Sequence, residues 1–256
     1  MFKFNFFSRG TIIYSQNKPQ VMINNFFKHN ISIDLFDVFF PETCVNCGKQ
    51  QEVKGKYLCF SCMSELPLTH FSNQEENVLE NSFKGRINLE AATSLLYFEK
   101  KGLVQKLIHE LKYKNKPEIG MFLGKWLVEE MRLSNRFESI DFVVPVPLHP
   151  TKEKKRGYNQ VHTFARALAD GLNAEVLLHL LRKVKNSQTQ TVKNRQQRIV
   201  NGEEQYIVTD KRLINNKHIL LVDDTITTGA TMQACADSLQ VVSDLKLSLA
   251  SMACTV

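Results

Sequence analysis

Residues 218–231, which read HILLVDDTITTGAT, constrain the fold of this 256-residue chain more than any other stretch. The aliphatic run is typical of a buried strand, and the pattern predicts that this strand ends at Val222. A turn follows, and we expect a helix to begin near Gly229. A strand that passes directly into a helix is typical of a parallel sheet, whose ligands bind at the carboxyl ends of the strands. The sequence therefore predicts that Asp223 and Asp224 lie at a ligand-binding edge.

The same alternation of strands and helices extends over much of the chain. Hydrophobic periodicity predicts strands at 91–98, 142–149, 175–184, 218–224 and 246–256. It predicts helices at 31–44, where Pro41 ends the helical run, and at 102–116, 118–131, 159–172 and 229–240, whereas the polar residues 68–88 are expected to form a loop or linker. The expected fold class is α/β, with a parallel sheet flanked by helices and right-handed crossovers.

The turn after the two acids suits an anion. Free N–H groups at the start of a helix bind phosphate, and the helix dipole assists them. Gly229 lets the backbone approach a ligand closely, and the hydroxyls of Thr227, Thr228 and Thr231 can add hydrogen bonds. The acids suit sugar hydroxyls or a hydrated Mg²⁺ instead. A ligand that carries both a phosphate and a sugar diol satisfies both halves of the motif. Without the preceding strand and acids, the Thr-Thr-Gly-Ala-Thr string would indicate an ordinary capped helix.

Two other nucleotide-binding signatures are absent. The chain has no G-x-G-x-x-G. Residues 120–126, GMFLGKW, resemble a Walker A loop, but three residues separate the glycines instead of four. Trp126 also occupies the position at which Ser or Thr would bind Mg²⁺.

Four of the six cysteines form two C-x2-C pairs, and eleven residues separate the pairs. The four are Cys44, Cys47, Cys59 and Cys62. Four thiolates in tetrahedral geometry suit a closed, structural Zn²⁺ site. The alternative is two disulfides or unrelated thiols, and nothing marks the chain as secreted. Cys235 and Cys254 are isolated and are expected to be small buried hydrophobes.

Positive charge is concentrated in one segment. The formal net charge is +7, and residues 151–200 hold eleven Lys and Arg against three Asp and Glu. Such a segment indicates an anionic partner, either a phosphorylated small molecule or nucleic acid. A solvated basic face is the equally valid alternative.

The first 29 residues contain basic and aromatic side chains and no acid. They lack the apolar core of a secretory signal. An organelle transit peptide, a disordered tail and a start at Met22 all remain open. No apolar run reaches the 18 residues of a membrane-spanning helix, so we expect a soluble, cytoplasmic protein with no membrane span.

Several motifs together resemble the ComF family (ComFC/GntX type) of phosphoribosyltransferase-like proteins. The acidic string and its turn are similar to the signature with which type I phosphoribosyltransferases bind phosphoribosyl pyrophosphate (PRPP). The family motifs are PVPLHP (145–150), RGYNQ (156–160), LIHELKY (107–113) and Gln190 followed by Arg198 and Asn201. The four-cysteine finger matches as well, so the resemblance covers about residues 31–256.

The resemblance implies a role for each matching residue. Asp223 and Asp224 would face the ribose, and one of them can assist as a base. The phosphate would lie against Thr225, Thr227, Thr228, Gly229, Ala230 and Thr231. Pro147, Leu148 and His149 would form the pyrophosphate loop with Arg156 behind it, unless His149 is only a turn residue. Residues 185–201, with Lys185, Arg195 and Arg198, would form a hood, although Arg198 and Asn201 could instead cap one another.

The implied organisation is a leader or tail (1–29), a helix with a double-zinc-ribbon-like finger (30–68) and a type I phosphoribosyltransferase-like domain (89–256). The cofactors would be structural Zn²⁺, and Mg²⁺ with PRPP. The implied function is phosphoribosyl transfer to an unknown acceptor, in competence for DNA uptake. The alternatives are an accessory protein that binds single-stranded DNA or the uptake machinery, with Tyr158 as the stacking residue, and a structural subunit with a vestigial site.

Overall fold

The computed structural model describes residues 43–50, 57–184 and 205–255. Residues 42–256 form one compact unit. The leader, the helix predicted over 31–44 apart from its last two residues, and the predicted hood with Arg198 therefore lie outside the described residues. No helix within the described ranges is long and apolar enough to cross a membrane.

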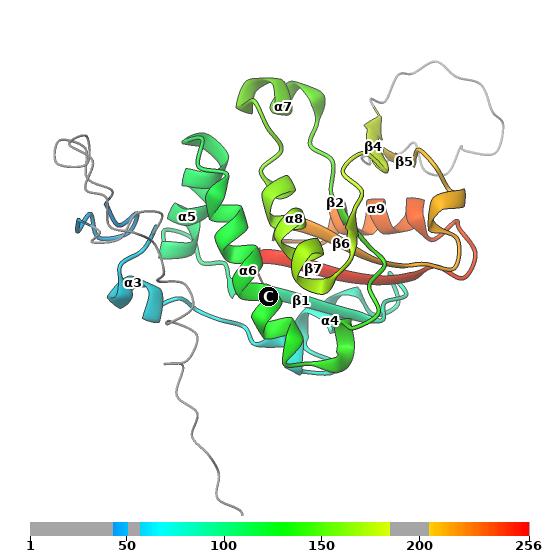
Figure 1. The fold of residues 1–256 in the computed structure, drawn as a ribbon, viewed down its shortest axis with the longest axis horizontal. Coiled ribbons are helices and arrows are strands. Elements are labelled where there is room, and N and C mark those ends of the chain that lie inside the picture. Colours follow the sequence, from blue (N-terminus) through cyan, green and yellow to red (C-terminus); the bar gives the residue numbers. More distant parts are fainter. Residues whose placement is uncertain (1–42, 51–56, 185–204, 256) are drawn as a thin grey trace, which may run out of the picture. The chain divides into compact units, whose positions relative to one another are not determined.

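A five-stranded parallel sheet forms the centre of this unit (Figure 1). Its order is β1 (Ala91–Tyr97), β7 (Lys246–Cys254), β6 (His218–Ile226), β2 (Phe142–Pro145) and β3 (Glu175–Val176). All four neighbouring pairs are parallel. The predicted fold class is confirmed. The strands β6 and β7 are almost wholly buried, as expected for a sheet that is covered on both faces.

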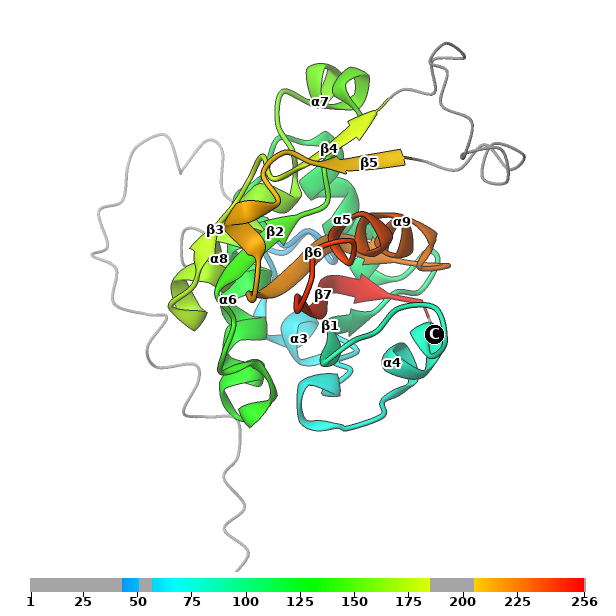
Figure 2. The same cartoon turned by 90° about the vertical axis from the view of Figure 1, so that its right-hand side faces the viewer.

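Helices cover the two faces of the sheet and create two apolar clusters (Figure 2). One face packs against α5 (Leu103–Tyr113), α6 (Glu118–Arg132) and α8 (Val161–Leu172). The other face packs against α4 (Val78–Phe83) and α9 (Ala230–Leu239). The remaining helical elements of the described residues are α3 (Phe60–Ser64), α7 (Pro150–Arg156) and the 3-10 turns η1 (Phe71–Asn73), η2 (Asn135–Phe137) and η4 (Arg212–Ile214).

The Walker-like glycines lie inside α6 and face α8, which supports the rejection of that motif. A Cβ at Gly124 would lie 2.7 Å from the Cβ of Ala167, and one at Gly120 would lie 2.5 Å from Oγ1 of Thr163. These glycines therefore permit a close approach of two helices and do not bind phosphate.

Three strand predictions were wrong in extent. The strand β6 continues past Val222 to Ile226 because its pairing with β7 extends to Cys254. The strand predicted over 142–149, which contains most of the motif PVPLHP, ends at Pro145 as β2. The segment predicted as one strand over 175–184 divides between two sheets, since β4 (Leu181–Val184) pairs antiparallel with β5 (Gln205–Val208).

The loop predicted over 68–88 was also wrong in part, because it contains η1 and α4. Asn77 caps α4 by accepting a hydrogen bond from the N–H of Glu80 at 3.0 Å. The Asn77 amide also donates to the carbonyls of Phe71 and Ala92 at 3.3 and 2.9 Å. These contacts connect the polar segment to β1, and Leu79 and Phe83 fill the cluster behind it.

Candidate functional site

The two acids of β6 are adjacent in sequence but lie in different surroundings. Asp224 is only 6% exposed, and its Oδ1 accepts a hydrogen bond from Nζ of Lys112 at 2.6 Å. Its Oδ2 accepts from Nε2 of Gln160 at 2.5 Å. Asp223 is half-buried, and its Oδ1 accepts from the N–H of Asp224 at 2.7 Å. Asp224 is therefore held within the protein, and Asp223 is the acid more accessible to a ligand.

A helix begins after Gly229 as predicted, but the turn before it is shorter than expected because β6 continues to Ile226. Gly229 is the N-cap of α9 with a φ of +73°, and a Cβ there would lie 2.6 Å from the ring of Phe83. Thr227, Thr228 and Ala230 are exposed. Thr225 instead lies within β6, and its Oγ1 is buried with no hydrogen-bond partner among the described residues.

Arg86 supports this turn through three groups. Its Nε and Nη2 donate to Oε1 of Gln233 at 3.0 and 2.7 Å, and its Nη1 lies 3.4 Å from the carbonyl of Thr228. The guanidinium also lies 5.5 Å from the centroid of the Phe83 ring. The segment predicted to be a loop thus supplies the turn with a packing ring and a hydrogen-bonding cation.

A cavity of about 240 Å³ opens beside the acids. The predicted site residues that line it are Pro147, Leu148, His149, Arg156, Asp223, Asp224 and Thr231. The other members of its lining are Lys112, Val146, Asn159, Gln160, Val161, Lys183 and Tyr206. Thr231, in the first turn of α9, is the residue of the predicted phosphate turn that lines the cavity. The other predicted phosphate-binding residues do not line it: Thr225, Thr227, Thr228, Gly229 and Ala230.

The helix α7 was not predicted, and His149 and Arg156 at its two ends line the cavity. His149 caps it: Nδ1 accepts from the N–H of Thr151 at 3.3 Å and lies 2.6 Å from its hydroxyl. Gly157 ends the helix with a φ of +82°. Pro at the start and Gly past the end of a segment are a recognised helix signal. His149 is therefore both the turn residue that its sequence suggested and a member of the cavity wall.

Five polar or aromatic residues of the cavity wall were missed from the sequence. Lys112, Asn159 and Gln160 stand inside the quoted motifs LIHELKY and RGYNQ, which were the available signal. Lys183 and Tyr206 come from β4 and β5, and Nζ of Lys183 lies 5.6 Å from the Tyr206 ring. Figures 1 and 2 both show this hairpin and α7 at the same end of the molecule.

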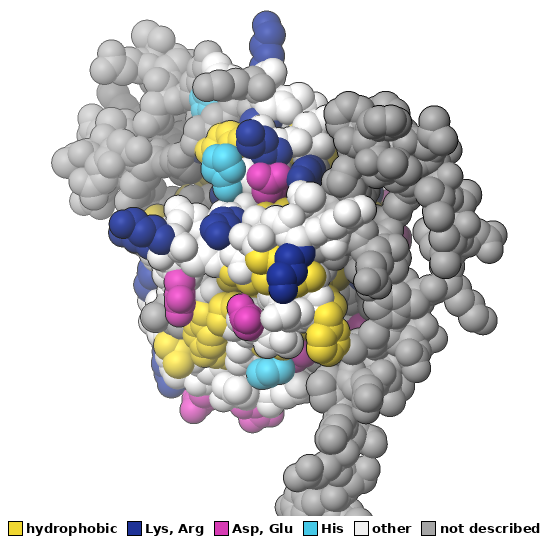
Figure 3. Space-filling model, turned by 90° about the vertical axis from the view of Figure 1, so that its left-hand side faces the viewer, with side chains coloured by type: hydrophobic (Ala, Val, Ile, Leu, Met, Phe, Trp, Pro, Cys, Tyr) yellow, Lys and Arg dark blue, Asp and Glu magenta, His cyan; other side chains and the backbone are white. Residues whose placement is uncertain are grey.

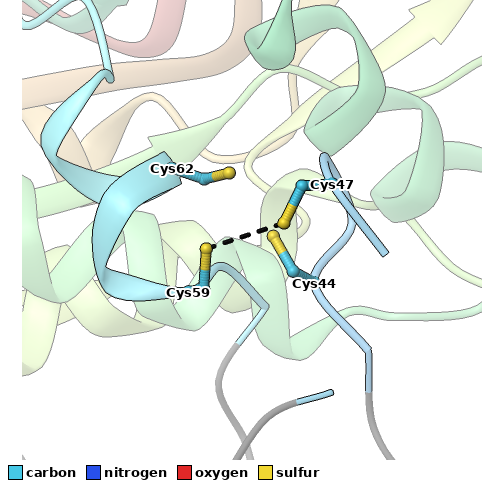
Figure 4. Close-up of side chains that lie close together, drawn as sticks. All are labelled: Cys44, Cys47, Cys59 and Cys62. Carbon is cyan, nitrogen blue, oxygen red and sulfur yellow. Dashed lines mark hydrogen bonds between the residues drawn. The ribbon is translucent and has the colours of Figure 1, made fainter. Parts of the chain in front are cut away.

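The four predicted cysteine ligands come together. Their sulfur atoms all lie within 4.8 Å of one another, and Sγ of Cys47 and Cys59 are 3.7 Å apart (Figure 4). Against the opposing effect of burial, backbone N–H donors at Cys47, Cys59 and Asn46 lower the pKa of Cys44 to about 6. Four convergent sulfurs of this kind fit Zn²⁺, which requires thiolates. Cys235 and Cys254 are buried elsewhere, as predicted.

The helix α5 connects this cysteine cluster to the cavity. Near its start, Nζ of Lys106 donates to Oδ1 of Asn46, inside the first C-x2-C pair, at 2.9 Å. Near its end, Lys112 reaches Asp224. Cys44 and Cys62 belong to the same apolar cluster as Leu107 and Leu111 of α5. The position of Lys112 therefore depends on a helix that is packed against the cysteines.

Comparisons with known proteins show what this chain is similar to. The model of the phosphoribosyl transferase domain family matches residues 162–246. Competence protein F of Haemophilus influenzae is 23% identical over 205 residues, which are 76% of this chain and 89% of that protein. The DNA utilization protein YhgH of Salmonella typhi is 27% identical over 136 residues, which are 52% of this chain and 59% of that protein, or less than two thirds of its length.

A solved structure, adenine phosphoribosyl transferase from Trypanosoma brucei in complex with AMP, pyrophosphate and ribose-5-phosphate, aligns with a TM-score of 0.33. Its sequence identity is 17%, and the alignment covers 70% of this chain and 68% of that one.

Proposed function

Since this chain is a phosphoribosyltransferase-like protein of the ComF type, we propose that its cavity binds PRPP and transfers the phosphoribosyl group to an acceptor. The names of its relatives support a role in competence or DNA utilization. The observation that carries the proposal is one cavity that combines an accessible acid, the start of a helix and two cations. These are Asp223, Thr231 at the start of α9, and Lys112 with Arg156.

Each part of the cavity has a task in this reaction. The turn before α9, which adjoins the cavity at Thr231, would hold the 5′-phosphate with its N–H groups, and Asp223 would face the ribose hydroxyls. The wall at Pro147, Leu148 and His149 would accept the pyrophosphate. Phosphoribosyl transfer passes through a sugar cation, so excluding water and stabilising the leaving anion both accelerate the reaction.

Mg²⁺ fits this donor set. Asp223 lines the cavity with its carboxylate, and the buried Asp224 is paired with Lys112. One or two carboxylates together with ligand phosphates form the usual environment of Mg²⁺. The ion would neutralise charge on the departing pyrophosphate.

Calorimetry of PRPP with Mg²⁺ tests the proposal. We expect wild type to bind, and Asp223→Asn and Thr231→Val to bind at least about tenfold more weakly, since each loses a polar contact to the ligand. Asp237→Asn removes an exposed acid from the same helix, α9, and should bind like wild type. Equal affinity of Asp223→Asn and wild type would contradict the site assignment. If PRPP binds, pyrophosphate release with a panel of nucleobases would identify the acceptor.

Binding of single-stranded DNA is a second candidate function. Tyr158 does not suit the predicted stacking role, because it is half-buried and its hydroxyl donates to the carbonyl of Leu111. Tyr113 is a better platform, since it is 61% exposed and the guanidinium of Arg156 lies 5.0 Å from its ring. On the face shown in Figure 3, however, basic, acidic and apolar side chains are interspersed.

Fluorescence anisotropy of a labelled oligothymidylate tests this candidate. Direct binding predicts an affinity that falls with salt and falls further in Tyr113→Ala. Leu133→Ala truncates another exposed apolar side chain and serves as the control. An affinity that is unchanged in Tyr113→Ala would contradict stacking at this position.

A further inference from the structure

Asp224 organises two cations of the cavity wall. Both of its oxygens are occupied by described side chains, Oδ1 by Lys112 and Oδ2 by Gln160. Gln160 is only 3% exposed, and its amide donates to the carboxylate through Nε2, which leaves Oε1 for another partner. That oxygen accepts a hydrogen bond from Nη1 of Arg156 at 2.8 Å. One carboxylate therefore orients Lys112 directly and Arg156 through an amide.

Two further contacts hold the residues on either side of Lys112. Nη2 of Arg156 lies 3.3 Å from the hydroxyl of Tyr113, the residue after Lys112. The hydroxyl of Tyr158 donates to the carbonyl of Leu111, the residue before Lys112. The end of α5 is thus connected on both sides of Lys112 to the last residue of α7 and to the segment that follows it. Both long basic side chains are therefore held by hydrogen bonds, although 21% of the Lys112 side chain is exposed.

We propose that Asp224 is a positioning residue that holds Lys112 and Arg156 as a paired cation site for the diphosphate part of the ligand. The proposal rests on the proposed function and changes one of its roles, because Asp224 then acts on the diphosphate and not on the ribose. Both cations line the cavity, and each keeps N–H groups beyond those that the carboxylate and the amide use. Two oriented cations suit the several oxygens of a diphosphate.

If only the net charge of the cavity mattered, removing the charge of Asp224 would strengthen anion binding. The positioning role predicts weaker binding, so one variant distinguishes the two. The cavity wall holds three cationic residues, Lys112, Arg156 and Lys183, against two acids. Replacing Asp224 by Asn removes one negative charge, so unscreened attraction alone would strengthen anion binding. If Asp224 works by orientation, the same change weakens binding, since Lys112 regains the freedom of its four-carbon stem.

Inorganic pyrophosphate without added Mg²⁺ is the diagnostic probe, because it has no ribose for Asp224 to contact. Isothermal titration should show Asp224→Asn and Lys112→Met each weakening pyrophosphate binding by roughly tenfold to a hundredfold. The double variant Asp224→Asn/Lys112→Met should bind pyrophosphate only slightly more weakly than Lys112→Met alone. The small further loss would come from Arg156, which Asp224 orients through Gln160. Lys112→Arg should keep most of the affinity. Lys154→Met removes an exposed cation from α7, outside the cavity lining, and should bind like wild type.

Thermal unfolding of each variant separates orientation from loss of the fold. If Asp224→Asn does not fold, Gln160→Met replaces it, because this change leaves the Lys112–Asp224 pair in place and disconnects only Arg156. Pyrophosphate affinity that is unchanged or increased in the folded Asp224→Asn or Gln160→Met variant would overturn the proposal, as would additive losses in the double variant.

PRPP is titrated in parallel so that the two proposals can fail separately. Wild type that binds pyrophosphate but not PRPP would end the proposed function and leave the cation site testable by its variants. In a further outcome, wild type binds PRPP, while Asp224→Asn binds PRPP more weakly but pyrophosphate equally well. That result would overturn the positioning role and show that Asp224 contacts the ribose. Wild type that binds neither probe would overturn both.

Discussion

Gly229 satisfies two requirements at once. Its φ of +73° lies where residues with a Cβ are disfavoured, and the Phe83 ring occupies the space that a Cβ would need. The second requirement comes from α4, about 150 residues earlier in the chain. A bulky substitution at Gly229 therefore disturbs the packing behind the turn as well as any ligand in front of it, and it would be a poor probe of binding.

Gly229→Ala should destabilise the protein more than Gly85→Ala does. Both glycines have a positive φ, but a Cβ at Gly85 would meet nothing within 4 Å. We expect a loss of about 1 kcal/mol at Gly85 and about 2–4 kcal/mol at Gly229, where overpacking adds to the backbone strain. Urea unfolding measures the difference. Equal losses in the two variants would mean that the Phe83 contact costs nothing.

The stability of the protein should decrease as the pH falls from about 6.5 to about 4. Burial, and next the charges of Arg166 and His179, lower the pKa of His162 from 6.5 to about 4. In that window the unfolded chain binds a proton that the folded chain does not, so folding is progressively disfavoured. His218, whose pKa burial also lowers, acts in the same direction.

His162→Gln should reduce this decrease, and the melting temperature across the pH series would measure the reduction. His109→Gln alters an exposed histidine of α5 and should leave the decrease in place. An identical pH profile in His162→Gln and wild type would contradict the assignment.

The sequence predicted which residues gather at the sheet edge but could not separate their tasks. The sequence motif alone does not distinguish Asp223 from Asp224. Their difference arises from Lys112 and Gln160, which are 112 and 64 residues away in the chain. Lys183 and Tyr206 were missed for the same reason, because only the pairing of β4 with β5 brings them to the cavity.

Among the elements, α6 and α8 show how small residues set a helix–helix distance. A Cβ at Gly124 would lie 2.7 Å from the Cβ of Ala167 and 3.0 Å from the carbonyl of Phe164. Alanine would favour the helix by about 1 kcal/mol, while forcing the two helices apart costs about 1–3 kcal/mol. The packing term is the larger of the two.

Gly124→Ala should therefore lower the free energy of unfolding. The loss should be smaller in an Ala167→Gly background, where the Cβ contact is removed, and a double-mutant cycle in urea measures this coupling. A stabilised Gly124→Ala variant would show that helix propensity outweighs the close approach.

Elements with a strong local period were predicted well, and those defined by distant partners were not. The helices α5, α6, α8 and α9 each bury a continuous apolar stripe, which is visible in the sequence. The helix α4 has only six residues and depends on the Asn77 cap and on Phe83 inserting beneath the turn. The segment 175–184 has the composition of one strand, but its two ends pair with different sheets.

Purified protein should contain about one zinc per chain, held by the four clustered cysteines. Cys62→Ser should lose most of the metal and destabilise the fold, because Cys62 is buried in the cluster that α5 helps to form. Elemental analysis and thermal unfolding measure both effects. Cys235→Ala changes a buried cysteine on the other face of the sheet and should retain the metal. Full zinc content in Cys62→Ser would contradict a four-thiolate site.

For the whole molecule, the order of the strands has a consequence for biosynthesis. The strand β7 lies between β1 and β6, although it follows both in the sequence. A nascent chain that has emerged from the ribosome as far as Ile226 already has the acids and both flanking strands, but it lacks the strand that joins them. Until residues 246–254 emerge, β1 and β6 each expose an unpaired edge, the kind of surface that chaperones shield during synthesis.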